Sequence, residues 1–170
     1  MKHGHKTLIT STGAIGLIAF SALLHATPIL IWNASASVSI GFYAVQPIDM
    51  PKVGDLVVLE PPSSLGDWLL ERGYIGADVP LIKHVAALPG RRVCRIGVTI
   101  SIDGNTVATA KTRDRFDRPL PVWQGCHLLT DDQVFFLNPD TDASLDGRYF
   151  GPLPRDTIVG LAVPLWTREA

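Results

Sequence analysis

Clusters of basic residues are missing from this sequence. Its 15 Lys and Arg residues are balanced by 16 Asp and Glu residues for a net charge of -1, and no segment gathers Lys and Arg into a stripe. Proteins that bind nucleic acid need such a stripe because they must neutralise phosphates. The sequence therefore predicts no nucleic-acid partner.

Cysteine is also scarce, with only Cys94 and Cys126 present. The two do not form a CxxC motif, and no nearby histidine completes a zinc set of standard spacing, so we expect neither a metal nor a cofactor. In an oxidising compartment such a pair closes a disulfide. The closed loop of about thirty residues would contribute roughly 3–4 kcal/mol by the chain-entropy model. Two buried free thiols are the alternative.

Asp, Glu, Lys and Arg are absent between Lys6 and Asp49. Within this stretch, residues 7–32 form an apolar run longer than the roughly 20 residues that cross a bilayer as a helix. We predict an uncleaved transmembrane helix, with Lys2 and Lys6 holding the N-terminus in the cytoplasm. Two other interpretations stay open: a secretory signal cleaved near residues 34–36, and a buried core helix.

The rest of the chain is divided into short apolar runs by Gly and Pro, of which the sequence has 15 and 13. This pattern is typical of β-structure. Only residues 67–74 predict a helix, and residues 111–118 predict an exposed loop. We expect a mainly β protein with one N-terminal transmembrane helix: an anchor at 1–32 and a compact antiparallel β-domain at 33–170. The predicted strands are 55–59, 81–88, 92–96, 98–102, 106–110, 134–137 and 158–163, with a hairpin turn at 103–105.

Two features of this domain suggest chemistry. Ser35 and Ser37 alternate just after the predicted anchor, so on an extended chain their side chains share one face. Lys83 is the only Asp, Glu, Lys or Arg within the apolar segment 79–88. Burial there would disfavour the ammonium form and lower its pKa, which allows a lysine to serve as a base for a serine nucleophile. The alternative is a lysine that extends into solvent and has no catalytic role.

These segments, in this order, resemble the conserved boxes of the signal peptidase I superfamily, and above all its conjugative-transfer branch, the TraF-type peptidases. The resemblance runs from about residue 33 to residue 166. Four boxes in the right order are more specific than any one of them. The matching residues are Asn33, Ser35, Ser37, Gly41 and Tyr43 in the first box, then the segments 54–58, 80–90 and 144–152.

The resemblance implies a serine–lysine dyad, with Ser37 as the nucleophile and Lys83 as its base. It also implies that the Ser35 hydroxyl and the Ser37 backbone N–H form the oxyanion hole. The resemblance further implies three residues that hold Lys83 in place. Ser144 would be the hydrogen-bond partner of the lysine nitrogen, and Asp146 and Arg148 would form a structural ion pair.

Three positions depart from the family pattern. Ser39 replaces a common Pro, which predicts a less rigid turn after Ser37 and adds a rival hydroxyl. His84 replaces a common Arg, and we expect it to be a structural or surface residue. Gly147 replaces a common Ser, which predicts a looser final box. None of the three removes a proposed catalytic group.

The implied function is a serine endopeptidase, single-pass in the bacterial inner membrane, with its catalytic domain in the periplasm. Its expected partners are membrane lipid and an exported precursor, above all the precursor pilin of a conjugative transfer system, which some members of the branch also cyclise. Two alternatives stay open. One is a general housekeeping signal peptidase, and the other is a non-catalytic periplasmic component of a conjugative secretion channel.

Overall fold

The computed structural model describes residues 12, 15–16 and 30–169. Most of the predicted anchor at 1–32 lies outside the described residues. No helix in the described part of the chain is both long enough and apolar enough to cross a membrane. The residues at the end of the predicted span belong to the first strand, β1 (Leu30–Asn33), which pairs with β2 (Ile40–Gln46).

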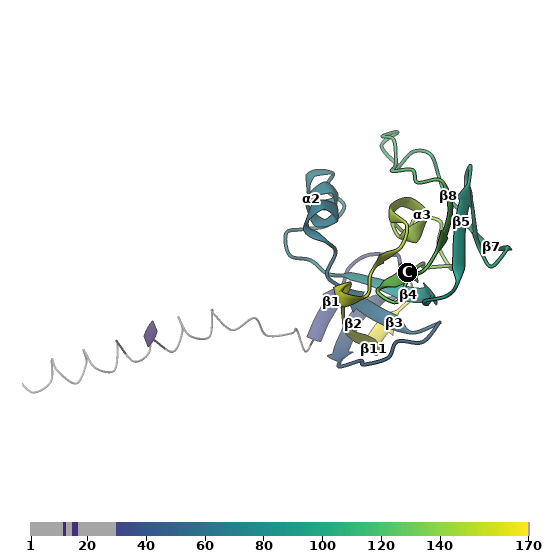
Figure 1. Cartoon of the computed structure of the whole chain (residues 1–170). Coiled ribbons are helices and arrows are strands. Elements are labelled where there is room, and N and C mark those ends of the chain that lie inside the picture. The colour runs from purple at the N-terminus through teal and green to yellow at the C-terminus, as the bar shows by residue number, and fades with distance from the viewer. Residues whose placement is uncertain (1–11, 13–14, 17–29, 170) are drawn as a thin grey trace, which may run out of the picture.

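Two antiparallel sheets make up the described domain (Figure 1), and every strand pairing among its residues is antiparallel. The larger sheet has seven strands in the order β1-β2-β11-β3-β4-β9-β10. Besides β1 and β2 it contains β3 (Leu56–Leu59), β4 (Leu81–Ala87), β9 (Gln133–Phe136), β10 (Leu153–Pro154) and β11 (Ile158–Arg168). The mainly β antiparallel architecture predicted from the sequence is therefore confirmed for this domain.

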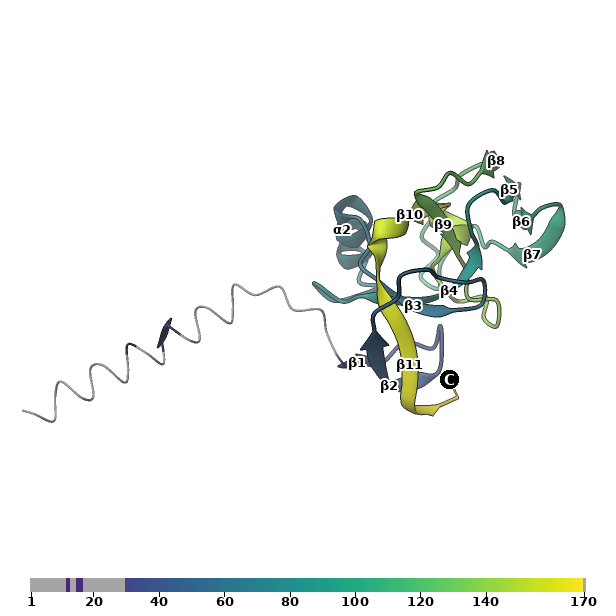
Figure 2. The same ribbon diagram turned by 60° about the horizontal axis from the view of Figure 1, so that its bottom comes forward.

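The smaller sheet has four strands in the order β7-β6-β5-β8. It lies on the side of the domain away from β1 and β2 in both ribbon views (Figures 1 and 2). The Asp103-Gly104 turn joins β6 to β7, as the hairpin prediction required. Its strands are β5 (Arg92–Ile96), β6 (Thr99–Ile102), β7 (Asn105–Thr109) and β8 (Gly125–Leu128).

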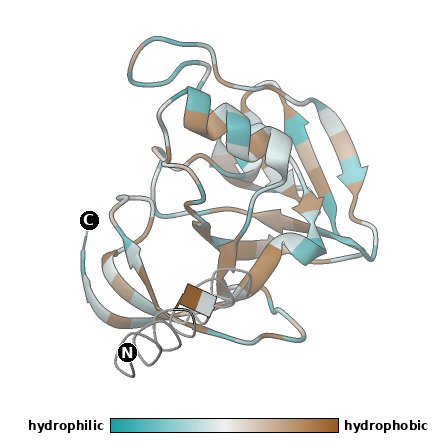
Figure 3. Ribbon diagram, turned by 90° about the vertical axis from the view of Figure 1, so that its left-hand side faces the viewer, coloured by the Kyte–Doolittle hydropathy of each residue, from teal (hydrophilic) through white to brown (hydrophobic). Residues whose placement is uncertain are grey.

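The main helix, α2 (Ser63–Glu71), begins four residues before the predicted start at residue 67. Pro62 occupies its N-cap with ψ of 146°, and a proline just before the first turn gives up no helical hydrogen bond. The helix ends before residue 74 because Gly73 takes a φ of +67°, a conformation that glycine adopts without steric cost. Figure 3 shows hydrophobic and hydrophilic residues alternating on α2, and Leu69 is its buried residue.

The core consists of three apolar clusters that the sheets enclose. One includes Val93, Ile100 and Phe135 and lies under the four-stranded sheet. A second includes Val57, Val85 and Phe136, from the centre of the seven-stranded sheet. The third, which we call the β2–β4 cluster, contains Tyr43, Val45, Val58, Ile82 and Ala162. It connects the part of the sheet that bears the serines to the strand that bears Lys83.

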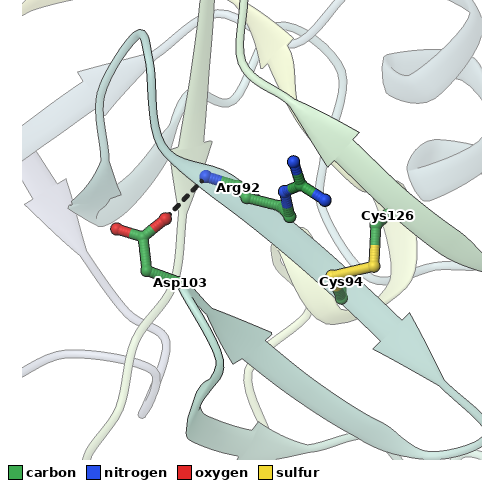
Figure 4. The surroundings of a disulfide bond; sticks show 4 residues. All are labelled: Arg92, Cys94, Asp103 and Cys126. Atoms are coloured by element: carbon green, nitrogen blue, oxygen red, sulfur yellow. Dashed lines mark hydrogen bonds between the residues drawn. A yellow bond between two sulfur atoms is a disulfide. The ribbon is translucent and has the colours of Figure 1, made fainter.

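The predicted disulfide is confirmed. Cys94 on β5 and Cys126 on β8 lie opposite each other in the strand register, and a bond joins their sulfur atoms (Figure 4). The two residues are 32 positions apart in the sequence. The bond fastens β8, which is an edge strand, to the neighbouring strand β5 of the four-stranded sheet.

The segment 111–118 is a loop, as predicted, but one of its carboxylates is anchored. The Asp114 side chain is 6% exposed, pairs with Arg118 at 2.7 Å and accepts a hydrogen bond from the Tyr74 hydroxyl at 2.5 Å. Burial would raise the pKa of Asp114, but the hydrogen bonds from Tyr74, Arg118 and Phe116 outweigh burial and lower the pKa well below its ordinary value. The loop is thus tied to the residues that follow α2.

Candidate active site

Lys83 is buried in the middle of β4, with 4% of its surface exposed. Its cross-strand partner on β3 is the apolar Val57, and its Nζ donates a hydrogen bond to Ser144 Oγ at 2.9 Å. The sequence analysis left open whether Lys83 is buried or extends into solvent, and in the structure it is buried. The contact with Ser144 is also the one that the family resemblance implies.

Burial changes the acid–base behaviour of Lys83. Desolvation of the ammonium group lowers its pKa from 10.5 to about 8; the charge of Asp146 works against this shift and that of Arg148 adds to it. At pH 7 a lysine with that pKa is neutral in about one molecule in ten, against about one in three thousand at the ordinary value. Lys83 is therefore able to accept a proton near neutral pH.

The loop that carries Ser144 is fixed by two buried charged side chains. Asp146 caps the short helix α3 (Gly147–Phe150) by accepting from the Arg148 backbone N–H at 3.1 Å, and it also accepts from the Asn138 N–H at 3.0 Å. Arg148 Nε lies 3.6 Å from the Asp146 carboxylate, and its other nitrogens donate to the carbonyls of Thr141 and Asn138. The predicted Asp146–Arg148 pair is thus present, and it closes the loop on both sides of Ser144.

Gly147 does not loosen this loop, contrary to our expectation from the sequence. A Cβ atom at this position would lie 2.5 Å from the Phe135 ring and 2.6 Å from the Phe136 carbonyl oxygen. The first residue of α3 therefore packs directly against β9, and only glycine leaves room for that approach. The glycine that replaces the common Ser of the family pattern therefore permits this close contact.

The serines lie on the loop between β1 and β2, and Asn33 organises that loop. Its Nδ2 donates to the carbonyls of Ser35, Val38 and Ser39 at 2.8–3.1 Å. Its Oδ1 accepts from the backbone N–H and the hydroxyl of Ser35. Since the Ser35 hydroxyl proton is used in this way, the 3.0 Å contact between the Ser35 and Ser37 hydroxyls has Ser37 as its donor.

The turn after Ser37 is held without the proline that is common in the family. The Ser39 carbonyl accepts hydrogen bonds from Asn33 Nδ2 at 3.0 Å and from the Tyr43 hydroxyl at 2.6 Å. Tyr43 is itself 1% exposed, and burial raises its pKa, so it remains a hydroxyl donor at neutral pH. The expected loss of rigidity at Ser39 is therefore offset by two side chains that fix its carbonyl.

The structure brings the predicted residues together as two groups. Ser35 and Ser37 form one with Asn33, and Lys83, Ser144, Asp146 and Arg148 form the other. Among the described residues, no hydrogen bond joins Ser37 to Lys83. The two groups adjoin the same core, because Val38 packs against the β2–β4 cluster and Ile82, next to Lys83, belongs to it.

Two residues of this site received no role in the sequence analysis. Asn33 was noted only as part of the first box, and Asn138 was not singled out. Asn33 could have been assigned from its position just before the serine-rich segment, since asparagine often binds the backbone of the turn that follows it. Asn138 offers no such local signal, because its partners on β4 lie 54 and 56 positions away.

The described residues include no group of three or more His, Cys, Asp or Glu side chains arranged to hold a metal ion. What the site offers is a hydroxyl on a shaped loop and an amine of lowered pKa. The chemistry open to such a pair is proton transfer followed by attack on a carbonyl carbon.

Comparisons with known proteins identify relatives over most of the chain. Residues 3–166 match the family model described as signal peptidase, peptidase S26. A probable conjugal transfer protein TraF of Sinorhizobium fredii is 37% identical over 79% of this chain and 76% of its own length. The conjugal transfer protein TraF of Agrobacterium fabrum is 36% identical over 79% of this chain and 81% of its own.

Among solved structures, a signal peptidase I from Enterococcus faecalis aligns with 67% of this chain and 97% of its own, at 19% identity and a TM-score of 0.39. The resemblance to the signal peptidase superfamily and its conjugative-transfer branch, predicted from the sequence boxes, is confirmed by the family match and by the two TraF relatives.

Proposed function

Because this chain belongs to the signal peptidase family S26, we propose that it is a membrane-bound serine endopeptidase that uses Ser37 and Lys83 to cleave exported precursor proteins. The observation that carries the proposal is the state of Lys83. It is buried, its pKa is lowered to about 8, and its nitrogen is oriented by Ser144. Burial of an amine costs stability, and in the described part of the chain no acidic side chain forms an ion pair with Lys83 that would offset this cost.

In the proposed reaction, neutral Lys83 takes the proton of the Ser37 hydroxyl while the oxygen bonds to the carbonyl carbon of the substrate. The Ser37 hydroxyl donates to Ser35 in this structure. Substrate binding must therefore turn it away from Ser35. The Ser35 hydroxyl must in turn rotate from Asn33 Oδ1 to donate to the oxyanion together with the Ser37 N–H. Catalytic hydrogen bonds are often loose or unmade before substrate binds.

The lysine then completes the cycle as an acid. Protonated Lys83 gives its proton to the leaving amine as the peptide bond breaks, which leaves an acyl ester on Ser37. Neutral again, it activates the water that hydrolyses the ester. If the N-terminal amine of the same substrate attacks in place of water, the product is a cyclic peptide.

The two TraF relatives favour one class of substrate. Both carry conjugal transfer in their names. We therefore assign to this chain the precursor pilin of a conjugative transfer system, processed in the periplasm by a domain anchored in the inner membrane through residues 1–32.

The decisive experiment compares three single substitutions in the full chain, produced together with the precursor pilin of the same transfer system. Ser37→Ala and Lys83→Ala should each abolish the mass change that marks pilin processing. Ser39→Ala is the matched control: it removes the neighbouring hydroxyl, whose loss leaves the described hydrogen bonds of Ser39 intact because these use its carbonyl. It should process pilin normally.

The outcomes separate the competing functions. If Ser37→Ala and Lys83→Ala both process pilin like the parent chain, the protein is a non-catalytic component and the proposal is wrong. If both abolish processing of other exported precursors as well as pilin, the chain is a general signal peptidase. If only Ser39→Ala is inactive, the nucleophile has been misassigned.

A further inference from the structure

Asn138 is buried, with 1% of its surface exposed, and lies two residues after Phe136, the last residue of β9. The pairing of β4 with β9 includes Val85 opposite Phe136, and the Leu137 N–H still donates to the His84 carbonyl at 3.0 Å. Continuing this register would bring Asn138 opposite Lys83. The backbone after Leu137 turns away from β4 instead, and the side chain of Asn138 forms the hydrogen bonds to β4 in place of its backbone.

The amide of Asn138 binds the backbone of β4 on both sides of Lys83. Its Nδ2 donates to the Ile82 carbonyl at 3.2 Å, and its Oδ1 accepts from the His84 N–H at 3.1 Å. The His84 ring nitrogen Nδ1 lies 3.1 Å from the same oxygen. Because that oxygen can only accept, Nδ1 carries the proton. One side chain thus satisfies two backbone groups that the departing strand would leave unpaired.

The backbone of Asn138 is fastened to the other wall of the site. Its N–H donates to the Asp146 carboxylate at 3.0 Å, and its carbonyl accepts from Arg148 at 2.5 Å. Asn138 therefore connects the strand that carries Lys83 with the loop that carries Ser144. These are the two segments that meet in the 2.9 Å contact between Nζ and Oγ.

We propose that Asn138 is a positioning residue for Lys83: its amide fixes β4 on both sides of the lysine and ties that strand to the Ser144 loop, which keeps the amine dry and aimed at Ser144. This role for Asn138 rests on the proposed function, because the position of the Lys83 amine is important only if Lys83 takes part in a reaction. The physical coupling that it asserts can be measured without any cleavage assay.

The test follows the titration of Lys83 in the full chain, labelled with lysine that carries ¹³C at the ε carbon and held in detergent micelles. Lys83→Met assigns the signal. The parent should titrate near 8. In Asn138→Ala, water fills the vacated space and pairs with the freed groups of Ile82 and His84. The hydrated ammonium is then favoured, and the midpoint should rise by about one unit or more.

Thr157→Ala is the matched control, since it also truncates a buried side chain that binds a backbone carbonyl, that of Pro154 at 2.6 Å. It has no described hydrogen bond to β4 or to the Ser144 loop, so the Lys83 midpoint should stay at the parent value. An equal shift in both variants, or no shift in Asn138→Ala, would overturn the proposal.

A second measurement on the parent chain holds even if Asn138→Ala does not fold. The His84 amide should exchange with solvent as slowly as the Val85 amide, which donates to the carbonyl of Asp55, the residue just before β3. Exchange at the rate of an exposed amide would show that Asn138 does not hold this strand. Neither measurement depends on cleavage, so failure of the peptidase proposal, seen with Ser37→Ala, remains distinguishable from failure of this one.

Discussion

The two halves of the candidate site are built in opposite ways. The serine half is local: Asn33 reaches its partners at most six positions away, and Ser35 is exposed. The lysine half is assembled from distant segments, since Lys83 and Ser144 are 61 positions apart and both are buried. A nucleophile must be reached by substrate, whereas a lysine base must be kept from water to lose its proton. The proposed roles of Ser37 and Lys83 therefore account for the difference in construction.

This contrast predicts that substitutions in the serine half change the reaction more than the stability, and that those in the lysine half change both. Four substitutions, two in each half, test this contrast.

In the serine half, the larger expected effect is that of Ser35→Ala on catalysis. Loss of one oxyanion donor typically costs about 2.7–4 kcal/mol of transition-state stabilisation, so the rate of precursor cleavage should fall about 10²–10³-fold. Stability should change little, because the side chain is exposed and its partner, Asn33, keeps three carbonyl contacts. Single-turnover kinetics and urea unfolding check the two parts. A loss of stability as large as the loss of rate would contradict the comparison.

Lys83→Met should reveal the energetic cost of the buried amine through the pH dependence of unfolding. The folded-state pKa of about 8 lies below the ordinary 10.5, so the unfolded chain binds more protons between these values. The cost is therefore fully present below pH 8 and disappears as the pH rises toward 10.5. Relative to Lys83→Met, the parent should gain about 3 kcal/mol in free energy of unfolding from pH 7 to pH 11.

Ser37→Ala serves as the control for that measurement. Its unfolding free energy should follow the parent at every pH, because a serine hydroxyl does not titrate in this range. If the unfolding free energy of Lys83→Met also ran parallel to that of the parent from pH 7 to pH 11, the Lys83 amine would be hydrated in the folded protein.

Gly147→Ala should destabilise the lysine half by about 1–3 kcal/mol, because the new methyl group meets the Phe135 ring and the Phe136 carbonyl oxygen. Gly66→Ala in α2 makes a matched comparison: its Cβ would have no neighbour nearer than 3.8 Å. There the same change should stabilise the protein by about 0.5–1 kcal/mol through helix propensity. Thermal unfolding of the two variants should move in opposite directions, and a common direction would argue against the packing at Gly147.

Tyr43→Phe should have the smallest effect. It removes the hydrogen bond to the Ser39 carbonyl and costs about 1 kcal/mol of stability. Because Asn33 still holds the same carbonyl, precursor cleavage should fall less than it does in Ser35→Ala. A rate loss as great as that of Ser35→Ala would show that Tyr43, rather than Asn33, shapes the serine loop.

Much of the architecture was predictable, because the alternating or apolar runs of β3, β4, β5, β6, β7 and β9 follow directly from burial. Two of the strands that were missed had no such signal. β8 is exposed along its length, and β1 lies at the end of an apolar run that also fits a membrane helix. β2 alternates clearly, but its residues were interpreted only as part of the serine box.

The candidate site was predictable in its residues and not in its connections. The family resemblance supplied Ser37, Lys83 and Ser144, and the apolar setting of Lys83 indicated its burial. The effects of Ser39 and Gly147 were misjudged because each depends on a contact with another side chain. For Ser39 this is the Tyr43 hydroxyl, four positions along the chain, and for Gly147 it is the Phe135 ring. Asn138 was missed for the same reason, since its bonds to β4 exist only once two distant segments meet.

The position of β11 in the sheet determines when the seven-stranded sheet can be completed during synthesis of the chain. It lies between β2 and β3 (Figure 2), although it is the last strand of the described chain to be synthesised. Until the ribosome has passed residue 168, the hairpin that carries the serines has no ladder to the strands around Lys83. In a partly synthesised chain, the segments that carry the candidate serines and Lys83 are therefore not yet joined within one sheet.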